Sequence, residues 1–145
     1  MIGLDTNILL RYLMCDDPLQ TPIVMALVGT LSAERTGYVS LVALAEVAWT
    51  LTHGRRMNKH ALLDNLNRLM AMHHVRFQSH EAVADALACF ACGSIDFPDH
   101  LIERTGHLDG CEVTMTFDRK ASKTVGFRLL DATSVQVLGT CGRVV

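Results

Sequence analysis

The chain has 145 residues, 50% of them hydrophobic, and a formal net charge of −2 at pH 7. This length predicts a single domain with a sizeable buried core. The mean hydropathy of +0.25 is high for a soluble monomer, which predicts that surplus apolar surface forms a subunit interface. The longest apolar stretch, residues 41–51, contains Glu46 and Thr50 and is too short to span a membrane. No charged leader precedes the first apolar segment, so we expect a cytoplasmic protein with no membrane partner.

Strand and helix signals alternate in the first half of the chain. Met1–Leu4 reads as a strand, and Asp5 or Thr6 caps a helix to about Met14. Asp17-Pro18 predicts a second helix start, with the helix running to about Arg35. Further predicted elements are a strand at 38–40, a helix at 41–52 capped by Ser40, and a helix at 58–72.

The second half continues the alternation. It predicts a strand at 74–78, a helix capped by Ser79 through Cys92, a helix from Asp96-Phe97-Pro98 to Gly110, and strands at 111–117 and 126–130. This order is typical of an α/β fold with a parallel central sheet of about five strands flanked by helices. We expect one domain over residues 1–131 and a C-terminal tail over residues 132–145, whose placement the sequence does not predict.

Acidic residues stand at positions that such a fold would bring to one rim. Asp5 and Asp118 each follow a predicted strand, and Ser40 begins the helix that carries Glu46. Ligands of open parallel sheets bind outside the carboxyl ends of the strands. Carboxylates gathered there repel one another unless protons or cations neutralise them, and oxygen ligands suit a hard divalent cation. The set therefore predicts metal-dependent phosphoryl transfer, as in a nuclease.

Each acidic residue also has a structural interpretation. Asp5 can cap a helix and Asp118 can begin a turn. Glu46 is harder to explain in this way, because its helix is apolar on every side and a buried, unpaired carboxylate is costly. The remaining ligand position lies at Asp96 or Asp99. Asp96 is explained as an N-cap, which makes Asp99 the better ligand candidate.

Cysteines and basic residues add weaker signals. Of the five cysteines, Cys89 and Cys92 have CxxC spacing, but no second pair follows, and their helical context predicts core cysteines. Basic residues cluster at 55–59 and at 119–123. Without the four proposed ligands, the fifteen acidic residues become eleven against thirteen basic ones. The first cluster is equally well explained as a solvated face, whereas the second follows Asp118 directly and favours phosphate contact.

Taken together, these residues resemble the PIN-domain ribonucleases, most closely the VapC-type toxins of bacterial toxin–antitoxin pairs. The matching segments are Leu4–Leu13, Ser40–Glu46, Asp96–Ile102 and Thr116–Arg119. The chain departs from the usual pattern at Pro98, His100 and Glu103, which leaves substrate preference open.

The resemblance implies a site and partners. In that family the acidic set binds Mg²⁺ or Mn²⁺, which here implies the carboxylates of Asp5, Glu46, Asp99 and Asp118. It also implies a homodimer and a tight complex with a small antitoxin. Supporting positions would be Thr6, Asn7, Asp96 and Thr116, and RNA would be contacted by Arg11, Arg119 and Lys120. An activated water would hydrolyse the RNA phosphodiester, leaving 5′-phosphate and 3′-hydroxyl ends.

Two other function classes are open. A non-catalytic PIN-like module would bind only RNA or a protein partner, although it would be expected to lack one or more of the acids. Haloacid-dehalogenase-like phosphatases also place an Asp after the first strand, but their chemistry needs a second Asp where this chain has Asn7.

Overall fold

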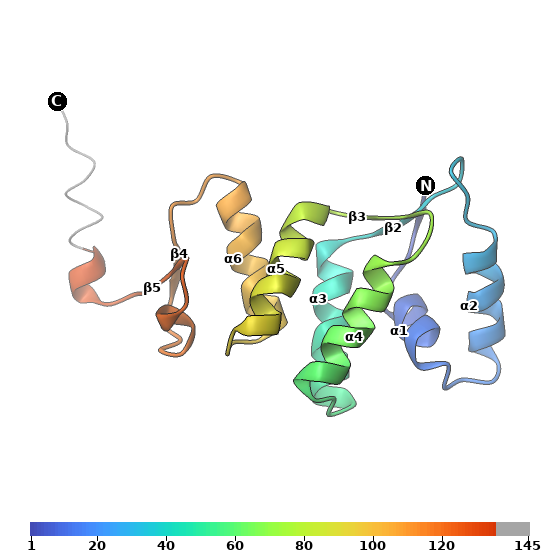
Figure 1. Cartoon of the computed structure of the whole chain (residues 1–145), viewed down its shortest axis with the longest axis horizontal. Helices are drawn as coiled ribbons and strands as arrows, with labels where there is room; N and C mark the ends of the chain where they lie inside the picture. The colour runs from blue at the N-terminus through green and yellow to red at the C-terminus, as the bar shows by residue number, and fades with distance from the viewer. Residues whose placement is uncertain (136–145) are drawn as a thin grey trace.

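A parallel three-stranded sheet organises the N-terminal part of the fold, seen in a computed structural model that describes residues 1–135 (Figure 1). Its strands are β1 (Ile2–Gly3), β2 (Gly37–Val39) and β3 (Val75–Phe77), paired in the order β1-β2-β3. In the register, Gly37 lies between Ile2 and Val75. The α/β class with parallel strands is confirmed.

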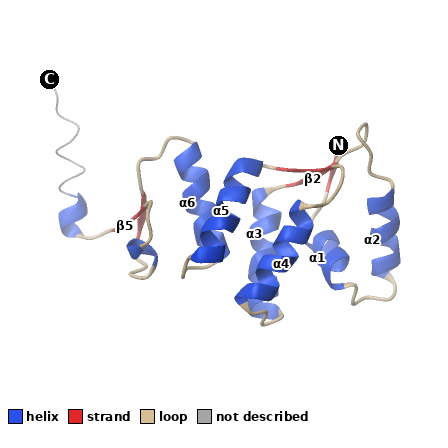
Figure 2. Ribbon diagram, viewed as in Figure 1, coloured by secondary structure: helices blue, strands red, loops and turns tan. Residues whose placement is uncertain are grey.

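Helices connect and cover the strands, as Figure 2 shows. They are α1 (Thr6–Met14), α2 (Gln20–Gly29), α3 (Leu41–Trp49), the π-helix η1 (Thr50–Gly54), α4 (Lys59–Met70), α5 (His80–Cys92) and α6 (Phe97–Leu108). A second, two-stranded parallel sheet contains β4 (Thr114–Thr116) and β5 (Phe127–Leu129), joined through the 3₁₀-helix η2 (Ala121–Lys123). In Figure 1 this small sheet and α2 lie at opposite ends of the helical array.

The strand arrangement differs in one respect from the sequence prediction. Five strands form among residues 1–135, but they divide into sheets of three and two rather than one central sheet. The described strands β1 and β4 are not hydrogen-bonded to each other. Each strand has only two or three residues, so few ladder bonds are available to hold a continuous sheet. Side-chain packing between helices therefore carries much of the architecture.

Three predicted helix starts are confirmed by side-chain caps. Asp5 accepts a hydrogen bond from the Ile8 N–H at 2.9 Å. Ser40 accepts one from Ala43 at 3.2 Å, and Asn58 accepts one from Ala61 at 2.9 Å. Each cap satisfies an N–H that has no partner inside its helix. Such contacts span three residues, which is why sequence alone could place these starts.

One predicted helix end and one predicted side-chain cap were wrong. The helix expected to reach Arg35 stops at Gly29, where Thr30 turns its hydroxyl back to the Leu27 carbonyl at 2.7 Å. Ser79 precedes α5 but makes no side-chain cap. Its backbone is left-handed, with φ at +47°, whereas a capping residue normally has extended backbone.

The core lies between the three-stranded sheet and the helices α1, α3, α4, α5 and α6. Its largest fully buried side chains include Leu9, Leu44, Leu51, Leu66 and Phe97. Phe97 meets Phe90 edge-to-face, with ring centroids 6.1 Å apart. No helix among residues 1–135 is long and apolar enough to cross a membrane.

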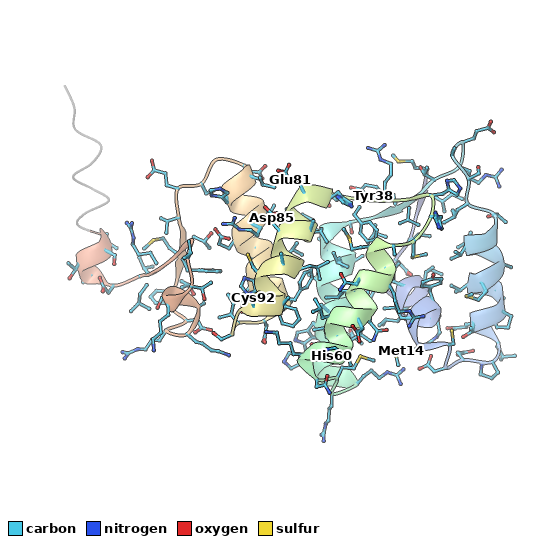
Figure 3. All side chains as sticks on the ribbon, in the orientation of Figure 1. Met14, Tyr38, His60, Glu81, Asp85 and Cys92 are labelled. Atoms are coloured by element: carbon cyan, nitrogen blue, oxygen red, sulfur yellow. The ribbon has the colours of Figure 1, made fainter. Side chains whose placement is uncertain are left out.

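The four cysteines among residues 1–135 are exposed and do not occupy the core. Cys89 and Cys92 are both exposed free thiols, so the prediction that they are core residues was wrong. Figure 3 places Cys92 near the end of α5, with Glu81 and Asp85 towards its start. The apolar side of α5 instead uses Ala82, Val83, Ala86, Leu87 and Phe90. Cys141 lies outside the described residues.

The small sheet is fixed to α6 by a close contact. Glu103 is 4% exposed and pairs with Arg104. Its carboxylate packs directly against Gly126, whose φ of +91° suits glycine. Glu103, one of the departures from the family pattern, therefore helps to hold the start of β5. The predicted tail begins with helical residues 132–135 after Asp131, and its apolar patch at 135–138 lies mostly outside the described residues.

Candidate active site

Asp5 lies at the carboxyl end of β1 and opens α1. Its Oδ1 atom is the N-cap acceptor for Ile8, so the structural interpretation of this residue is realised. The side chain is nevertheless exposed, and capping uses only one of its two carboxylate oxygens. Among the described residues Oδ2 accepts no hydrogen bond. Asp5 can thus cap α1 and offer an oxygen to a ligand at the same time.

Glu46 reaches the same region from α3. Its Oε2 accepts a hydrogen bond from the Thr6 hydroxyl at 2.7 Å, which ties α3 to the start of α1. The side chain is exposed, so the burial argument drawn from its apolar helix was wrong. The apolar residues of α3 divide between the core and an exposed side, where Val42 and Trp49 are 77% and 56% exposed.

Asp5, Thr6 and Glu46 line one open hollow of about 340 Å³. Ser40 and Tyr38 complete its polar lining from the end of β2. The sequence presented Ser40 only as a cap and gave no functional signal for Tyr38. Both reach the hollow because β1 and β2 are neighbours and end at the same edge.

A second acidic group gathers where α6 begins. Asp96 holds the N-cap position but makes no side-chain cap hydrogen bond, so the prediction that it caps through its carboxylate was wrong. Asp99 lies in the first turn of α6 and is partly buried. Asp118 follows β4, and its Oδ1 accepts hydrogen bonds from Lys120 N at 2.6 Å and Ala121 N at 3.1 Å. Asp118 therefore does begin a turn.

The carboxylates of Asp96, Asp99 and Asp118 interact electrostatically, and this interaction affects the pKa of Asp99. Burial raises the pKa of this carboxyl above its ordinary value, and the charges of Asp96 and Asp118 raise it further. Lys120 acts in the opposite direction and lowers it. Like charges gathered in this way repel one another, and a bound cation would relieve that repulsion.

The four predicted ligands are thus distributed between two places. Asp5 and Glu46 share the hollow at the end of β1, whereas Asp99 and Asp118 interact at the start of α6. Within residues 1–135 no three His, Cys, Asp or Glu side chains are grouped so that they could hold a metal ion. The donor chemistry fits a hard divalent cation, because every candidate is a carboxylate and Asp99 is destabilised by its neighbours' charge.

The residues predicted to support the site or to contact RNA differ in whether the fold leaves them free. Asn7 is exposed beside Asp5, and Thr116 accepts a hydrogen bond from the Asp118 N–H at 3.0 Å. Arg119 and Lys120 are exposed and follow Asp118, which suits phosphate contact. Arg11 is already engaged, because its guanidinium pairs with Asp16 at 3.1 Å.

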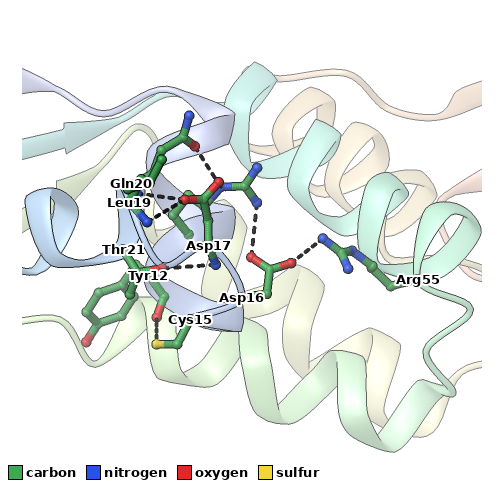
Figure 4. Close-up of polar contacts among 9 residues, drawn as sticks. Tyr12, Cys15, Asp16, Asp17, Leu19, Gln20, Thr21 and Arg55 are labelled. Atoms are coloured by element: carbon green, nitrogen blue, oxygen red, sulfur yellow. Dashed lines mark hydrogen bonds and ion pairs between the residues drawn. The ribbon is translucent and has the colours of Figure 1, made fainter.

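The basic cluster at 55–59 is largely used within the fold. Arg55 pairs with Asp16, as Figure 4 shows. Lys59 donates to the Gly93 carbonyl at 2.7 Å and lies 5.3 Å above the Phe90 ring. Arg55, Arg56 and Lys59 are all exposed, so these contacts favour the interpretation of this cluster as a solvated face.

Comparison with known families agrees with this architecture. A model of the PIN domain matches residues 2–126. The chain belongs to the PIN domain family. Its relatives in that family are generally nucleases, which supports a nuclease-type hydrolase. The match covers both acidic groups and ends just before β5. No protein with a curated description matches the chain.

Proposed function

We propose that this PIN domain is a Mg²⁺- or Mn²⁺-dependent endoribonuclease and the toxin of a toxin–antitoxin pair. The observation that carries the proposal is that Asp5 and Glu46, from different elements, open onto one solvent-accessible hollow. The cap accounts for Asp5, and the Thr6–Glu46 hydrogen bond holds a second carboxylate in the same hollow.

Asp5, Glu46, Asp99 and Asp118 are the residues that would hold the cation. When bound, it supplies positive charge to the scissile phosphate and acidifies a water molecule for attack. Thr6 orients Glu46 through its hydroxyl, and Asp5 is held by its cap to α1. Lys120 lies close enough to influence Asp99, so it can also neutralise phosphate charge beside the acidic group.

The toxin role, the antitoxin and the homodimer rest on the resemblance to VapC-type chains. One surface feature supports a protein contact. A hollow of about 420 Å³ between α3 and α6 is almost wholly apolar, and it exposes Val42 and Ile102. Exposed apolar surface of this kind favours association with a second chain. The proposal places both the protein and its RNA substrate in the cytoplasm.

The decisive experiment measures cleavage of labelled single-stranded and stem–loop RNAs with Mg²⁺, with Mn²⁺ and with excess EDTA. Parent protein should cleave only when a divalent cation is free, and Glu46→Gln should reduce cleavage at least about a hundredfold. Glu81→Gln makes the same substitution at an exposed position of α5 and should cleave as the parent does. Undiminished cleavage in EDTA, with metal content verified as nil, contradicts the metal-dependent mechanism.

A non-catalytic PIN-like module is the second candidate. The observation that favours it is that Asp5 and Asp118 both serve as local caps, while the described residues contain no assembled group of three ligands. It predicts RNA binding with no cleavage under any metal condition. The phosphatase alternative is not supported, because the chain belongs to the PIN domain family.

A further inference from the structure

A second hollow adjoins the proposed active site on the other side of Asp5. It has a volume of about 220 Å³ and lies between α1 and α2. Asn7 and Arg11 line it from α1, and Gln20 and Ile23 line it from α2. Asp5 lines this hollow as well as the one that contains Glu46. A ligand that fills both spaces would therefore pass directly over the Asp5 carboxylate.

Arg11, which lines this hollow, is held by carboxylate neighbours. Its Nη1 donates to Asp16 Oδ1 at 3.1 Å, and Asp17 lies 3.9 Å from its Nε. Asp16 is held in turn by Arg55 from beyond α3 (Figure 4). Two carboxylates around one guanidinium balance its charge locally. Arg11 is therefore better suited to positioning a neighbour than to binding a phosphate.

The neighbour that Arg11 positions is Gln20. The Nε of Arg11 donates to Gln20 Oε1 at 2.8 Å, and an N–H donor requires the carbonyl oxygen on that side. Figure 4 shows the Gln20 side chain with a dashed line at its amide oxygen and none at its amide nitrogen. Among residues 1–135 this amide nitrogen donates no hydrogen bond, so its N–H groups can serve a ligand of the hollow that Gln20 lines. Gln20 is exposed at the start of α2, and the hydrogen bond from Arg11 fixes the orientation of its carboxamide.

The remaining lining combines an amide with aliphatic surface. Asn7 presents a second exposed carboxamide next to Asp5. Ile23 is 70% exposed and adds apolar surface to the lining of the hollow. Carboxamides read base edges through paired donors and acceptors, and unstacked RNA bases bind where such groups meet apolar surface. A phosphate would bind weakly here, because the positive charge of Arg11 is already balanced by Asp16 and Asp17.

We propose that this hollow is a nucleobase subsite for the RNA nucleotide adjoining the scissile phosphate, with Gln20 as the residue that determines base preference. Arg11 acts as a positioning residue that fixes the Gln20 carboxamide. This inference rests on the proposed ribonuclease function. It assigns the recognition of one base to residues that lie outside the acidic groups.

The test compares cut-site preference rather than rate. A pool of random single-stranded RNA is cleaved with Mn²⁺, and the bases flanking each cut are counted by sequencing. The parent should favour particular bases at one position beside the cut, and Gln20→Leu should flatten that preference by roughly tenfold. Arg11→Lys retains the charge beside Asp16 but loses the Nε donor, so it should relax the same position. Asn67→Leu removes an exposed carboxamide from α4 and should leave the preference unchanged.

A binding experiment separates this inference from the proposed function. Asp99→Asn protein, with or without Gln20→Leu, is titrated with labelled tetranucleotides of A, C, G or U, and fluorescence anisotropy gives the Kd of each. Affinity that depends on the base and loses that dependence with Gln20→Leu supports the subsite even if the parent cleaves no RNA. Equal affinities for all four tetranucleotides, or a cut-site preference that survives Gln20→Leu, overturn it.

Discussion

The Thr6 hydroxyl donates a hydrogen bond to Glu46 Oε2 at 2.7 Å, across 40 residues of sequence. This bond joins the first turn of α1 to the middle of α3 and holds Glu46 at the hollow that Asp5 also lines. A hydroxyl that orients a metal-binding carboxylate acts on the site through that carboxylate. Thr6 is thus the polar residue most directly coupled to the proposed ligands.

The first prediction follows from that bond. Thr6→Val keeps the side-chain shape but removes the donor, so cleavage and Mn²⁺ affinity should fall by about 10- to 100-fold. Thr6→Ser retains the hydroxyl and should keep most of both. Calorimetric titration with Mn²⁺ and RNA cleavage rates measure the two quantities. Equal metal affinity in Thr6→Val and the parent would mean that this hydrogen bond has only a structural role.

The second prediction concerns pH. Because burial and the charges of Asp96 and Asp118 raise the pKa of Asp99 in the folded state, ionised Asp99 disfavours folding above that raised pKa. The penalty shrinks as pH falls through the raised pKa and disappears below the ordinary value of 3.8, where the carboxyl is protonated in both states. In chelator, Asp99→Asn should therefore be more stable than the parent at pH 7 and similar to it near pH 3.5.

Urea denaturation of both proteins at several pH values measures this difference in the free energy of unfolding. Asp85→Asn, at an exposed position in the middle of α5, is the control and should change stability little at any pH. Added Mn²⁺ should reverse the order at neutral pH, because a cation bound only to the folded parent stabilises it. A parent that stays the more stable protein in chelator at pH 7 contradicts the repulsion argument.

The third prediction separates the two roles of Asp5. Asp5→Asn retains an oxygen for the Ile8 N–H and should fold with nearly parental stability, yet it should lose cleavage and most of the Mn²⁺-induced rise in Tm. Asp5→Ala loses the cap as well and should cost about 1 kcal/mol. Asn58→Ala removes a cap from α4 at a similar cost but should keep cleavage. Thermal melts with chelator and with Mn²⁺ decide this, and equal shifts in Asp5→Asn and parent would leave Asp5 with capping alone.

The fourth prediction concerns Asp96. Because its carboxylate makes no cap hydrogen bond, Asp96→Ala should change the free energy of unfolding by less than about 0.5 kcal/mol. This is well below the loss expected for a working cap such as Asn58. Chemical denaturation of the two alanine variants in parallel measures the contrast. A cost equal to that of Asn58→Ala would show that Asp96 does cap α6 in solution.

The fifth prediction tests how β5 is held. An alanine at Gly126 would place its Cβ inside the Glu103 carboxylate and would require the left-handed φ of +91°. Gly126→Ala should therefore destabilise the fold by roughly 2–4 kcal/mol. Gly29→Ala, at the end of α2 with open space around it, should be neutral or slightly stabilising. Denaturation midpoints of the two variants provide the comparison, and equal midpoints would rule out the packing contact.

Local chemistry made much of the fold predictable. Asp5, Ser40 and Asn58 begin helices because each side chain bonds an N–H three residues ahead, and such a contact is visible in the sequence. The alternation of short apolar strands with helices likewise predicted parallel pairing. The prediction failed at Ser79, where the backbone conformation and not the residue type decides whether a cap forms.

The candidate site was only partly predictable, for a physical reason. The residue types of Asp5 and Glu46 indicated carboxylate chemistry, but the exposure of Glu46 depends on which side of α3 packs against the core. Likewise, Arg11 reads as an RNA contact in the sequence, whereas Asp16 and Gln20 engage it in the fold.

The sequence by itself determined the elements, their order, the family and the carboxylate character of the site, because these follow from local hydrogen bonding and residue chemistry. Only the tertiary structure decided the division into two sheets, the Thr6–Glu46 bond and the orientation of Gln20. Each of these depends on how separate helices pack. Such packing joins residues far apart in the chain through many small contacts, none of which is visible in any single segment.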